Sequence, residues 1–258
     1  MRAPHENPDL RYVEHTSAGA EYVRQINARE EDRRTRAAFR ELVLRIAAPG
    51  ARLFDFGAGP GIDARYFAEQ GFSVDAYDVD PLMREYFVDH CRDVIDSGRV
   101  NLETGSYREF LAAGNTEPKR RADLVISNFA PLNLVDDLCE LFGTFAALTG
   151  PQGRVLASVL NPCFSGELRS RWWWRRAPRL WRDGQLFLPG PQAPHYRRRL
   201  EHFRRASGPD FRLVRVFGGL PPDGAHRDGI DVAGAGRLAW LHLLRSRFIF
   251  LLFEKTAT

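Results

Sequence analysis

Amphipathic and fully apolar stretches follow one another along this chain of 258 residues. Near the N-terminus, Phe39, Leu42, Val43 and Ile46 recur at helical spacing within a charged segment that contains no glycine. This pattern predicts a helix over residues 20–47. Short apolar runs begin directly after it, so the helix is expected to lead into a sheet.

The short apolar runs predict seven strands, and three amphipathic segments between them predict helices. Because strands and helices alternate, the sheet is expected to be largely parallel and covered on both faces. The last two strands have no clear helix between them, which predicts an antiparallel pair at the edge of the sheet. The predicted strands are 52–57, 72–80, 99–105, 122–129, 153–161, 211–219 and 247–255, and the predicted helices are 62–71, 81–95 and 136–150.

The composition is that of a globular protein, with 44% hydrophobic and 27% charged residues. With this length it predicts one domain over residues 1–258. The fold class expected is α/β, with a doubly wound, Rossmann-like sheet of seven strands. The formal net charge is +4, and all but two of the basic residues are arginine. Such a bias is not by itself an indication of a nucleic-acid partner.

The cysteines argue against disulfide and metal chemistry. Cys91, Cys139 and Cys163 are odd in number and far apart, with no CxxC pair and no histidine cluster. The N-terminus lacks an apolar signal region, and the longest apolar run, residues 248–253, is too short to span a bilayer. These features predict a cytoplasmic protein without a bound metal or a transmembrane segment.

A glycine-rich turn follows the first predicted strand. Gly57, Gly59 and Gly61 allow a tight turn and a close approach of backbone to ligand, and the next helix offers free N–H groups. The spacing is one residue shorter than the GxGxxG of dinucleotide-binding proteins, and no GK[ST] follows. Asp55, just before the turn, disfavours a pyrophosphate, so the turn favours an uncharged or cationic ligand group.

A second acidic residue completes this nucleoside-binding pattern. Asp78 ends the second predicted strand, where its carboxylate can accept hydrogen bonds from both hydroxyls of a ribose. Nicotinamide-dependent oxidoreductases use an acid in the same place, so that class stays open as an alternative. The short glycine spacing and the lack of a Tyr-x-x-x-Lys pair oppose it.

Four segments together resemble the class I S-adenosylmethionine-dependent methyltransferases, of the type that acts on small molecules. FDFGAGPG resembles the first motif of the family, AYDVDPLM the second, ETGSYREF the segment beside the adenine, and ADLVISNFAPLNLV the fourth motif. The similarity spans residues 39–162. It implies a reversed C-terminal strand, S-adenosylmethionine as cofactor and S-adenosylhomocysteine as product.

The resemblance also implies which residues contact the cofactor. The glycines would surround the methionyl part, Asp55 would help to hold its ammonium group, and Asp78 would bind the ribose. Residues of the second motif would flank the adenine, and those of the fourth would lie beside the sulfonium. The implied contacts are Asp55, Gly57, Ala58, Gly59, Gly61, Asp78, Val79, Met83, Ser106, Tyr107, Asn128 and Phe129.

The chain departs from the family pattern at two places. Many relatives have an aspartate where Ser106 stands, which leaves the adenine amine without that partner. Close relatives often carry a histidine or a polar pair after the fourth motif, where this chain has Pro131 and Asn133. A catalytic role does not transfer to these two residues, although Asn133 remains a candidate for substrate contact.

Residues 162–207 are expected to form a substrate cover inserted after the fifth methyltransferase strand, and residues 1–48 an N-terminal helical lid. The segment HYRRRLEHF resembles one found in many small-molecule methyltransferases, so His195 and Tyr196 are the candidate catalytic pair. His195 could equally be a helix cap or a lid contact. The candidate substrate contacts are Tyr12, Tyr22, Asn133, Trp172, His195, Tyr196 and Arg197.

The cover is strongly basic and aromatic. Residues 169–205 hold eleven arginines, two acidic residues and four of the five tryptophans. Such a segment can lie on an anionic membrane surface, stack on nucleic-acid bases or line a pocket for an anionic aromatic or lipid-like acceptor. It can also be an amphipathic helix that only packs its indoles on the cover.

The combined hypothesis is a methyltransferase that acts on an oxygen or nitrogen atom of a small-molecule metabolite, as a monomer or homodimer. A methyltransferase directed at nucleic acid or lipid is an alternative that would use the Arg/Trp-rich cover. Nucleic acid is the less favoured substrate, because NFAPLN lacks the Asn/Asp-Pro-Pro-aromatic motif of enzymes that methylate its amino groups. A cofactor-binding protein without catalysis is the remaining alternative.

Overall fold

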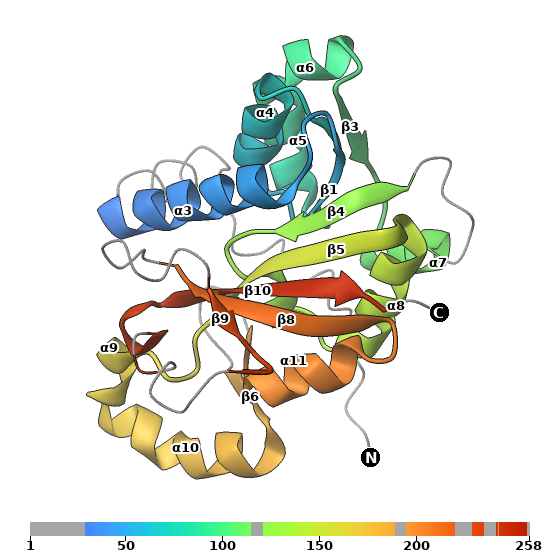
Figure 1. Ribbon diagram of the computed structural model, residues 1–258. Coiled ribbons are helices and arrows are strands. Elements are labelled where there is room, and N and C mark those ends of the chain that lie inside the picture. The colour runs from blue at the N-terminus through green and yellow to red at the C-terminus, as the bar shows by residue number, and fades with distance from the viewer. Residues whose placement is uncertain are drawn as a thin grey trace, which may run out of the picture.

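The computed structural model describes residues 29–114, 121–188, 195–219, 229–234, 241 and 243–256. Its centre is a sheet of eight strands in the order β3-β2-β1-β4-β5-β10-β8-β9 (Figure 1). The strands of this sheet are β1 (Arg52–Phe56), β2 (Ser73–Tyr77), β3 (Val100–Glu103), β4 (Ala122–Ser127), β5 (Thr149–Leu160), β8 (Phe211–Gly218), β9 (Ile230–Asp231) and β10 (Phe248–Lys255).

The strand directions confirm the predicted doubly wound fold. Strands β3, β2, β1, β4 and β5 pair in parallel, whereas β10 is antiparallel to both β5 and β8. The reversed C-terminal strand is therefore present, and all seven predicted strands form. The eighth strand is the two-residue β9, which pairs with β8 and is too short to leave a hydrophobic pattern in the sequence.

Helices cover the sheet on both faces (Figure 1). One face is covered by α3 and α4 and the other by α7, α8 and α11, as the membership of the two core clusters shows. The helices are α3 (Glu30–Ile46), α4 (Ile62–Glu69), α5 (Pro81–His90), α6 (Arg92–Asp96), α7 (Tyr107–Gly114), α8 (Leu138–Leu148), α9 (Ser165–Leu168), α10 (Arg171–Asp183) and α11 (Leu200–Ser207).

Strand β10 shows how one strand serves both cores. Its six residues from Phe248 to Phe253 are all buried. Because side chains alternate across a strand, Ile249, Leu251 and Phe253 join the cluster beneath α8 and α11, and their neighbours join the cluster beneath α3 and α4. This explains why the sequence there is continuously apolar rather than alternating.

Helix boundaries follow local chemistry that the sequence pattern only partly revealed. Asp80 caps α5 by accepting a hydrogen bond from Leu82 N at 2.9 Å, and Pro81 occupies the first turn. The predicted helix 81–95 is divided at Cys91, whose thiol is buried against Gly61 between α5 and α6. Helix α7 was not predicted.

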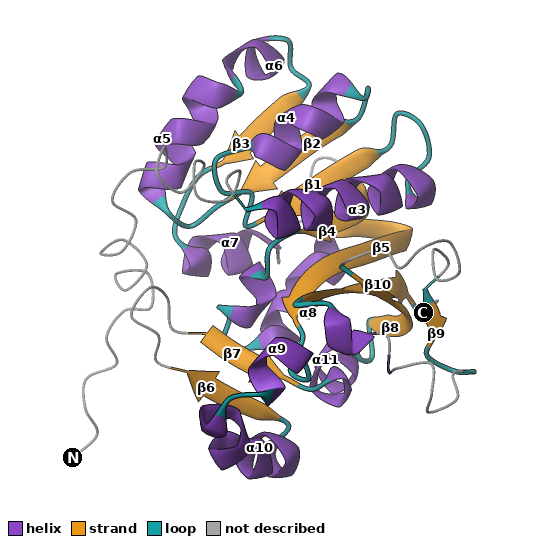
Figure 2. Ribbon diagram, turned by 90° about the vertical axis from the view of Figure 1, so that its left-hand side faces the viewer, coloured by secondary structure: helices purple, strands orange, loops and turns teal. Residues whose placement is uncertain are grey.

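The cover contains a separate two-stranded antiparallel sheet, β6 (Gln185–Leu188) and β7 (His195–Arg198). Figure 2 shows α9, α10 and this hairpin together outside the main sheet. Helix α11, which ends the predicted cover, instead packs Phe203 into the main core. The cover is thus anchored at both ends, by β5 and by α11.

The strand order reverses between β1 and β4. In open α/β sheets, ligands bind outside the carboxyl ends of the strands at such a reversal. The glycine-rich turn after β1 and the loop after β4 both lie at this point. The fold therefore places the first and fourth motifs side by side.

Candidate functional site

The turn after β1 has the conformation that glycine alone adopts without strain. Gly57 and Gly61 have φ angles of 72° and 80°. A Cβ atom on Gly57 would lie 2.5 Å from Cβ of Pro131, and one on Gly61 would lie 2.6 Å from Sγ of Cys91. The packing of the folded chain, rather than space for a ligand, therefore requires glycine at these two positions.

Gly59 is different, because a Cβ atom there would meet no atom within 4 Å. Its N–H donates to Asp78 Oδ2 at 2.7 Å, so the turn is tied to the end of β2. Gly57 N and Ala58 N both donate to the carbonyl of Tyr77, at 2.8 and 3.0 Å. The open side of the turn at Gly59 is where a ligand can approach the backbone.

Asp78 is buried at the end of β2, and its second oxygen accepts a hydrogen bond from Asp80 N at 2.9 Å. Burial raises the pKa of its carboxyl to about 6, although the N–H groups of Asp80 and Gly59 act in the opposite direction. A carboxylate oxygen accepts more than one hydrogen bond. Asp78 therefore retains the capacity to bind two ligand hydroxyls.

Asp55 lies in β1, two residues before the turn, and is buried. Burial, followed by repulsion from Asp63 and Asp78, raises the pKa of its carboxyl well above the usual value. Within the described residues, Asp55 Oδ2 has no hydrogen-bond partner. A ligand that brings N–H donors or positive charge would satisfy this oxygen, as the ammonium group of S-adenosylmethionine would.

A buried ion-pair cluster beside the turn was not foreseen from the sequence. Asp63, in the first turn of α4, accepts hydrogen bonds from Arg36 Nη1 at 2.6 Å and from Arg40 Nε at 2.7 Å, both on α3. It also accepts one from Asn128 Nδ2, at 2.9 Å. Burial by itself would raise the pKa of Asp63, but the two arginines lower it below its usual value.

The loop after β4 is held in an uncommon backbone conformation. Phe129 and Ala130 have φ angles of 61° and 68°, although neither is glycine. Residues in this region carry strain of about 1–3 kcal/mol each and concentrate at functional sites. The ring of Phe129 lies 4.6 Å from the Arg36 guanidinium and packs edge-on against Phe248. The kink thus borders both the turn and the ion-pair cluster.

The remaining predicted cofactor contacts surround the end of β2. Met83 is buried and Val79 is half-buried against the core. Ser106 caps α7 through a reciprocal pair of hydrogen bonds with Glu109, at 2.7 Å and 3.3 Å. The hydroxyl of Tyr107 is buried without a partner in the described part of the chain, and burial raises its pKa.

Asn133 joins the loop after β4 to the cover. Its side chain is fully buried, accepts a hydrogen bond from Leu160 N at 3.0 Å and donates one to the carbonyl of Tyr196 at 2.6 Å. Both ends of the amide are therefore engaged with backbone. In this structure the contacts of Asn133 position β7, whereas substrate contact stays a prediction.

The candidate pair His195 and Tyr196 begins β7, and adjacent strand residues point to opposite sides. The Tyr196 hydroxyl donates to Asp136 Oδ1 at 2.6 Å. Burial and then this hydrogen bond raise the pKa of Tyr196 to about 12. Tyr196 therefore keeps its proton at neutral pH. The candidates Tyr12 and Tyr22 lie outside the described residues.

Arg198 also joins β7 to the segment that follows β4. Its guanidinium is fully buried and donates to the carbonyls of Leu132, Val135 and Asp136, at 2.8, 2.6 and 3.0 Å. Burial lowers the pKa of Arg198 to about 10, which leaves it charged at neutral pH. Arg198 was not singled out from the sequence, where it is one of three consecutive arginines.

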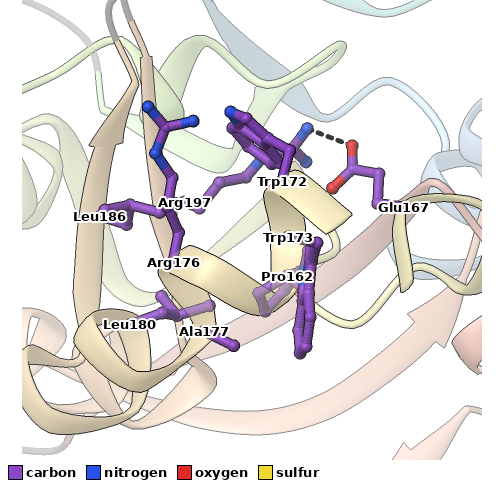
Figure 3. A pocket seen from close by; sticks show the side chains of 9 residues that line it. All are labelled: Pro162, Glu167, Trp172, Trp173, Arg176, Ala177, Leu180, Leu186 and Arg197. Atoms are coloured by element: carbon purple, nitrogen blue, oxygen red, sulfur yellow. Dashed lines mark hydrogen bonds and ion pairs between the residues drawn. The ribbon is translucent and has the colours of Figure 1, made fainter. Parts of the chain in front are cut away.

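Trp172 and Arg197 both line a pocket within the cover (Figure 3). Trp173 is buried and its indole N–H donates to the carbonyl of Pro162 at 3.0 Å, whereas Trp174 is 62% exposed. In the described part of the chain, no group of three or more His, Cys, Asp or Glu residues could hold a metal ion. No helix there is long and apolar enough to cross a membrane.

The strand order and the glycine turn beside Asp78 define a Rossmann-like fold of the class I methyltransferase type. The profile of the family described as "Methyltransferase domain" matches residues 29–207, and the chain belongs to this family. The predicted enzyme class, with S-adenosylmethionine as methyl donor, is confirmed at the level of the family. A search of curated proteins found no match.

Solved structures confirm the fold at low sequence identity. A 1,6-didemethyltoxoflavin-N1-methyltransferase from Burkholderia thailandensis, solved with bound 1,6-didemethyltoxoflavin and S-adenosylhomocysteine, is 17% identical to this chain. The match has a TM-score of 0.58 and covers 99% of this chain and 93% of that one. An S-adenosylmethionine-dependent methyltransferase from Mesorhizobium loti is 18% identical, with coverages of 89% and 99% and a TM-score of 0.53. The glycopeptide N-methyltransferase MtfA is 16% identical, with coverages of 85% and 94% and a TM-score of 0.52.

Proposed function

We propose that the protein transfers a methyl group from S-adenosylmethionine to an oxygen or nitrogen atom of a small-molecule metabolite. The observation that carries this proposal is the convergence of an open glycine turn, two buried carboxyls and a strained loop at the reversal of strand order. Two of the similar structures support it, because their names describe methylation of toxoflavin precursors and glycopeptides at nitrogen.

The cofactor residues are proposed as follows. Asp78 accepts hydrogen bonds from the ribose, while Asp55 compensates the ammonium group next to the glycine turn. Val79 and Met83 flank the adenine, with Ser106 and Tyr107 at its edge. Asn128 and Phe129 lie beside the methionyl end, where the ion pairs of Asp63 hold Asn128 in place.

The bound cofactor supplies a methyl group already activated on a sulfonium, so the protein mainly has to orient the acceptor and exclude water. The cover performs this task in our proposal, since β7 is fixed to the loop after β4 by Asn133 and Arg198. Of the candidate pair, His195 suits removal of a proton from the acceptor. Tyr196, with a pKa of about 12 and its O–H donated to Asp136, does not suit removal of a proton.

One alternative has a structural observation in its favour. Helix α10 exposes Trp174, Trp181 and several arginines, which is typical of surfaces that contact anionic lipid. A lipid-directed methyltransferase is therefore the second candidate. The oxidoreductase alternative loses its basis, because the chain belongs to a methyltransferase family. The cytoplasmic location and the monomeric or dimeric state stay predictions.

The test is incubation of purified protein with a cell extract and S-adenosylmethionine labelled in its methyl group, followed by separation into small-molecule, lipid, nucleic-acid and protein fractions. Label in the small-molecule fraction supports the proposal, and label in lipid supports the alternative. The Asp78→Ala variant is the control and should abolish transfer in either case. If the protein binds S-adenosylhomocysteine tightly but transfers the labelled methyl group to no fraction, it is not an enzyme for any molecule of that extract, and the proposal is contradicted.

A further inference from the structure

Helix α10 packs on the rest of the cover through one narrow stripe. Its buried residues are Trp173, Ala177 and Leu180, which recur at intervals of four and three positions and so share one helix face. The indole N–H of Trp173 also donates to the carbonyl of Pro162 at 3.0 Å. This stripe explains how α10 is attached to the protein.

A second aromatic stripe of α10 remains outside the core. Trp174 and Trp181 are seven positions apart, which is two helical turns, so they lie on the same side of the helix with Pro178 between them. Trp181 is 49% exposed, and Trp174 is the most exposed large hydrophobic residue in the described part of the chain. Because the indole N–H of Trp174 already donates to the carbonyl of Leu168 at 2.7 Å, the ring surface that stays exposed is apolar.

Exposed arginines lie beside this aromatic stripe. Asp183 is the one acidic residue of α10, and it pairs with Arg182 at 2.7 Å and with Arg179 at 3.7 Å. Arg171 and Arg175 form no ion pair with any described residue. The exposed side of the helix therefore combines two indoles with permanent positive charge that the described fold does not neutralise.

The positive charge of the protein is concentrated in the cover. Residues 169–205 hold eleven arginines against two acidic residues, whereas the formal net charge of the whole chain is only +4. The remaining residues are therefore net negative. Figures 1 and 2 show α10 at the outer edge of the molecule, at the end opposite α6. An anionic plane would attract this end and repel the rest, and would so orient the molecule with α10 toward the plane.

We propose that α10 docks the protein on an anionic lipid surface, with Trp174 and Trp181 in the headgroup region and the exposed arginines at the lipid phosphates. Indole rings favour this depth because they are amphipathic. A helix at the outer edge of a molecule suits a flat interface, whereas proteins that bind single-stranded nucleic acid without sequence preference track it with a basic groove. This inference does not depend on the proposed methyl transfer, and it does not make lipid the methyl acceptor.

The experiment measures co-sedimentation of the full chain with lipid vesicles at physiological ionic strength. Vesicles of phosphatidylcholine and phosphatidylglycerol in equal amounts are compared with vesicles of phosphatidylcholine alone. We expect at least about tenfold stronger binding to the anionic vesicles, and weaker binding as salt is added. Equal binding to both kinds of vesicle, or binding to neither, would overturn the proposal.

Arginine variants locate the electrostatic contribution. Arg171→Gln combined with Arg175→Gln should weaken binding to the anionic vesicles by about fivefold for each charge removed. The matched control combines Arg34→Gln with Arg92→Gln, which removes two exposed charges from α3 and α6. It should change binding by less than about twofold, because these charges are far from the lipid and screened. Equal effects of the two double variants would exclude α10 as the docking element.

Tryptophan variants test insertion of the indoles. Trp174→Ser combined with Trp181→Ser should weaken vesicle binding at least about tenfold, since both rings leave water on docking. Leu44→Ser, at an exposed position of α3, is the control and should bind as the unaltered protein does. Brominated lipid should quench the fluorescence of the unaltered protein, because four of its five tryptophans lie in the cover. Absence of quenching on bound vesicles would overturn the proposal even if the double variant does not fold.

Other occupants of this helix face have their own readouts. Fluorescence anisotropy with labelled oligonucleotides tests nucleic acid, and sedimentation velocity without lipid tests a second copy of the chain. Either of two results would replace lipid as the partner: oligonucleotide binding without vesicle binding, or a dimer that the tryptophan variant dissociates. Calorimetric titration with S-adenosylhomocysteine in the absence of vesicles tests the proposed function separately.

Discussion

Asp63 and Asn128 are 65 positions apart in the sequence, yet their side chains are joined by a hydrogen bond of 2.9 Å. Asp63 lies in the first turn of α4, after the glycine turn, and Asn128 follows directly after β4, so the bond connects the first and fourth methyltransferase motifs. Arg36 and Arg40 extend the same cluster to α3. The N-terminal helix is thereby fixed over the turn by charge as well as by apolar packing.

Replacement of Asp63 by asparagine should be strongly destabilising. The two arginines would lose their carboxylate partner in a site where their side chains are only 11% and 20% exposed. Removal of one partner from a buried ion pair costs about 3–5 kcal/mol, which chemical denaturation would detect as a lower midpoint. Glu30→Gln, which breaks the exposed pair with Arg34, is the control and should leave the midpoint almost unchanged. Similar effects of both variants would contradict this account.

Affinity for S-adenosylhomocysteine should depend on pH through Asp78. The pKa of Asp78 is about 6 in the folded protein, above the ordinary value of 3.8. The protonated carboxyl therefore makes its full contribution to folding stability below pH 3.8, and this contribution is lost as the pH rises through 6. Ribose hydroxyls prefer the ionised form, which accepts hydrogen bonds only. The affinity should therefore rise between pH 5 and pH 7 and then level off, as calorimetry can measure. Asp78→Asn should give a weaker and flat profile, and a flat profile in the unaltered protein would refute the assignment.

Gly57 and Gly59 should respond differently to alanine. At Gly57 the new Cβ would overlap Pro131, so Gly57→Ala should lower the unfolding free energy by about 2–4 kcal/mol. At Gly59 the space is open, and the cost should be limited to the strain of a positive φ, about 1–2 kcal/mol. Gly59→Ala should instead weaken binding of S-adenosylhomocysteine, because the methyl group occupies the side from which the ligand approaches. Unchanged affinity in Gly59→Ala would place the cofactor elsewhere.

Tyr196→Phe should retain methyl transfer at a reduced rate. The variant loses the hydrogen bond to the Asp136 carboxylate, worth about 1.5–3 kcal/mol, but no group that titrates near neutral pH. The rate is expected to fall by less than about tenfold, with an unchanged pH profile below pH 9. His195→Ala should lower the rate more, because it removes the group proposed to take the proton of the acceptor. Loss of all activity in Tyr196→Phe would make Tyr196 the catalytic residue.

Much of the fold could be predicted, because strands such as β4 and β10 are buried on both faces and read as continuous apolar runs. The glycine turn and Asp78 could be predicted for a related reason, since their chemistry depends on residues close together in sequence. Helix α7 was missed although Ser106 and Glu109 form an S-x-x-E capping box, a signal present in the sequence.

The ion-pair cluster and the kink at Phe129 and Ala130 could not be predicted in the same way. Arg36 and Arg40 have the spacing of any exposed helical pair, and only the tertiary fold shows that Asp63 lies between them. A positive φ in residues other than glycine leaves no trace in the sequence, because the surrounding structure imposes it. Arg197 was singled out as a substrate contact, but only the structure shows that its side chain is buried and forms an ion pair with Glu167.

The position of β10 also determines how the chain can fold. Strands β1 to β5 can pair in parallel without it, but among the described residues β8 joins the main sheet only through β10, and β9 only through β8. Contacts between segments so distant in sequence form slowly, because closing long loops costs entropy. Assembly should therefore proceed in two stages, with an N-terminal half-sheet whose β5 edge stays open until the last strand arrives. During that interval the exposed edge of β5 is the point at which two unfinished chains would associate.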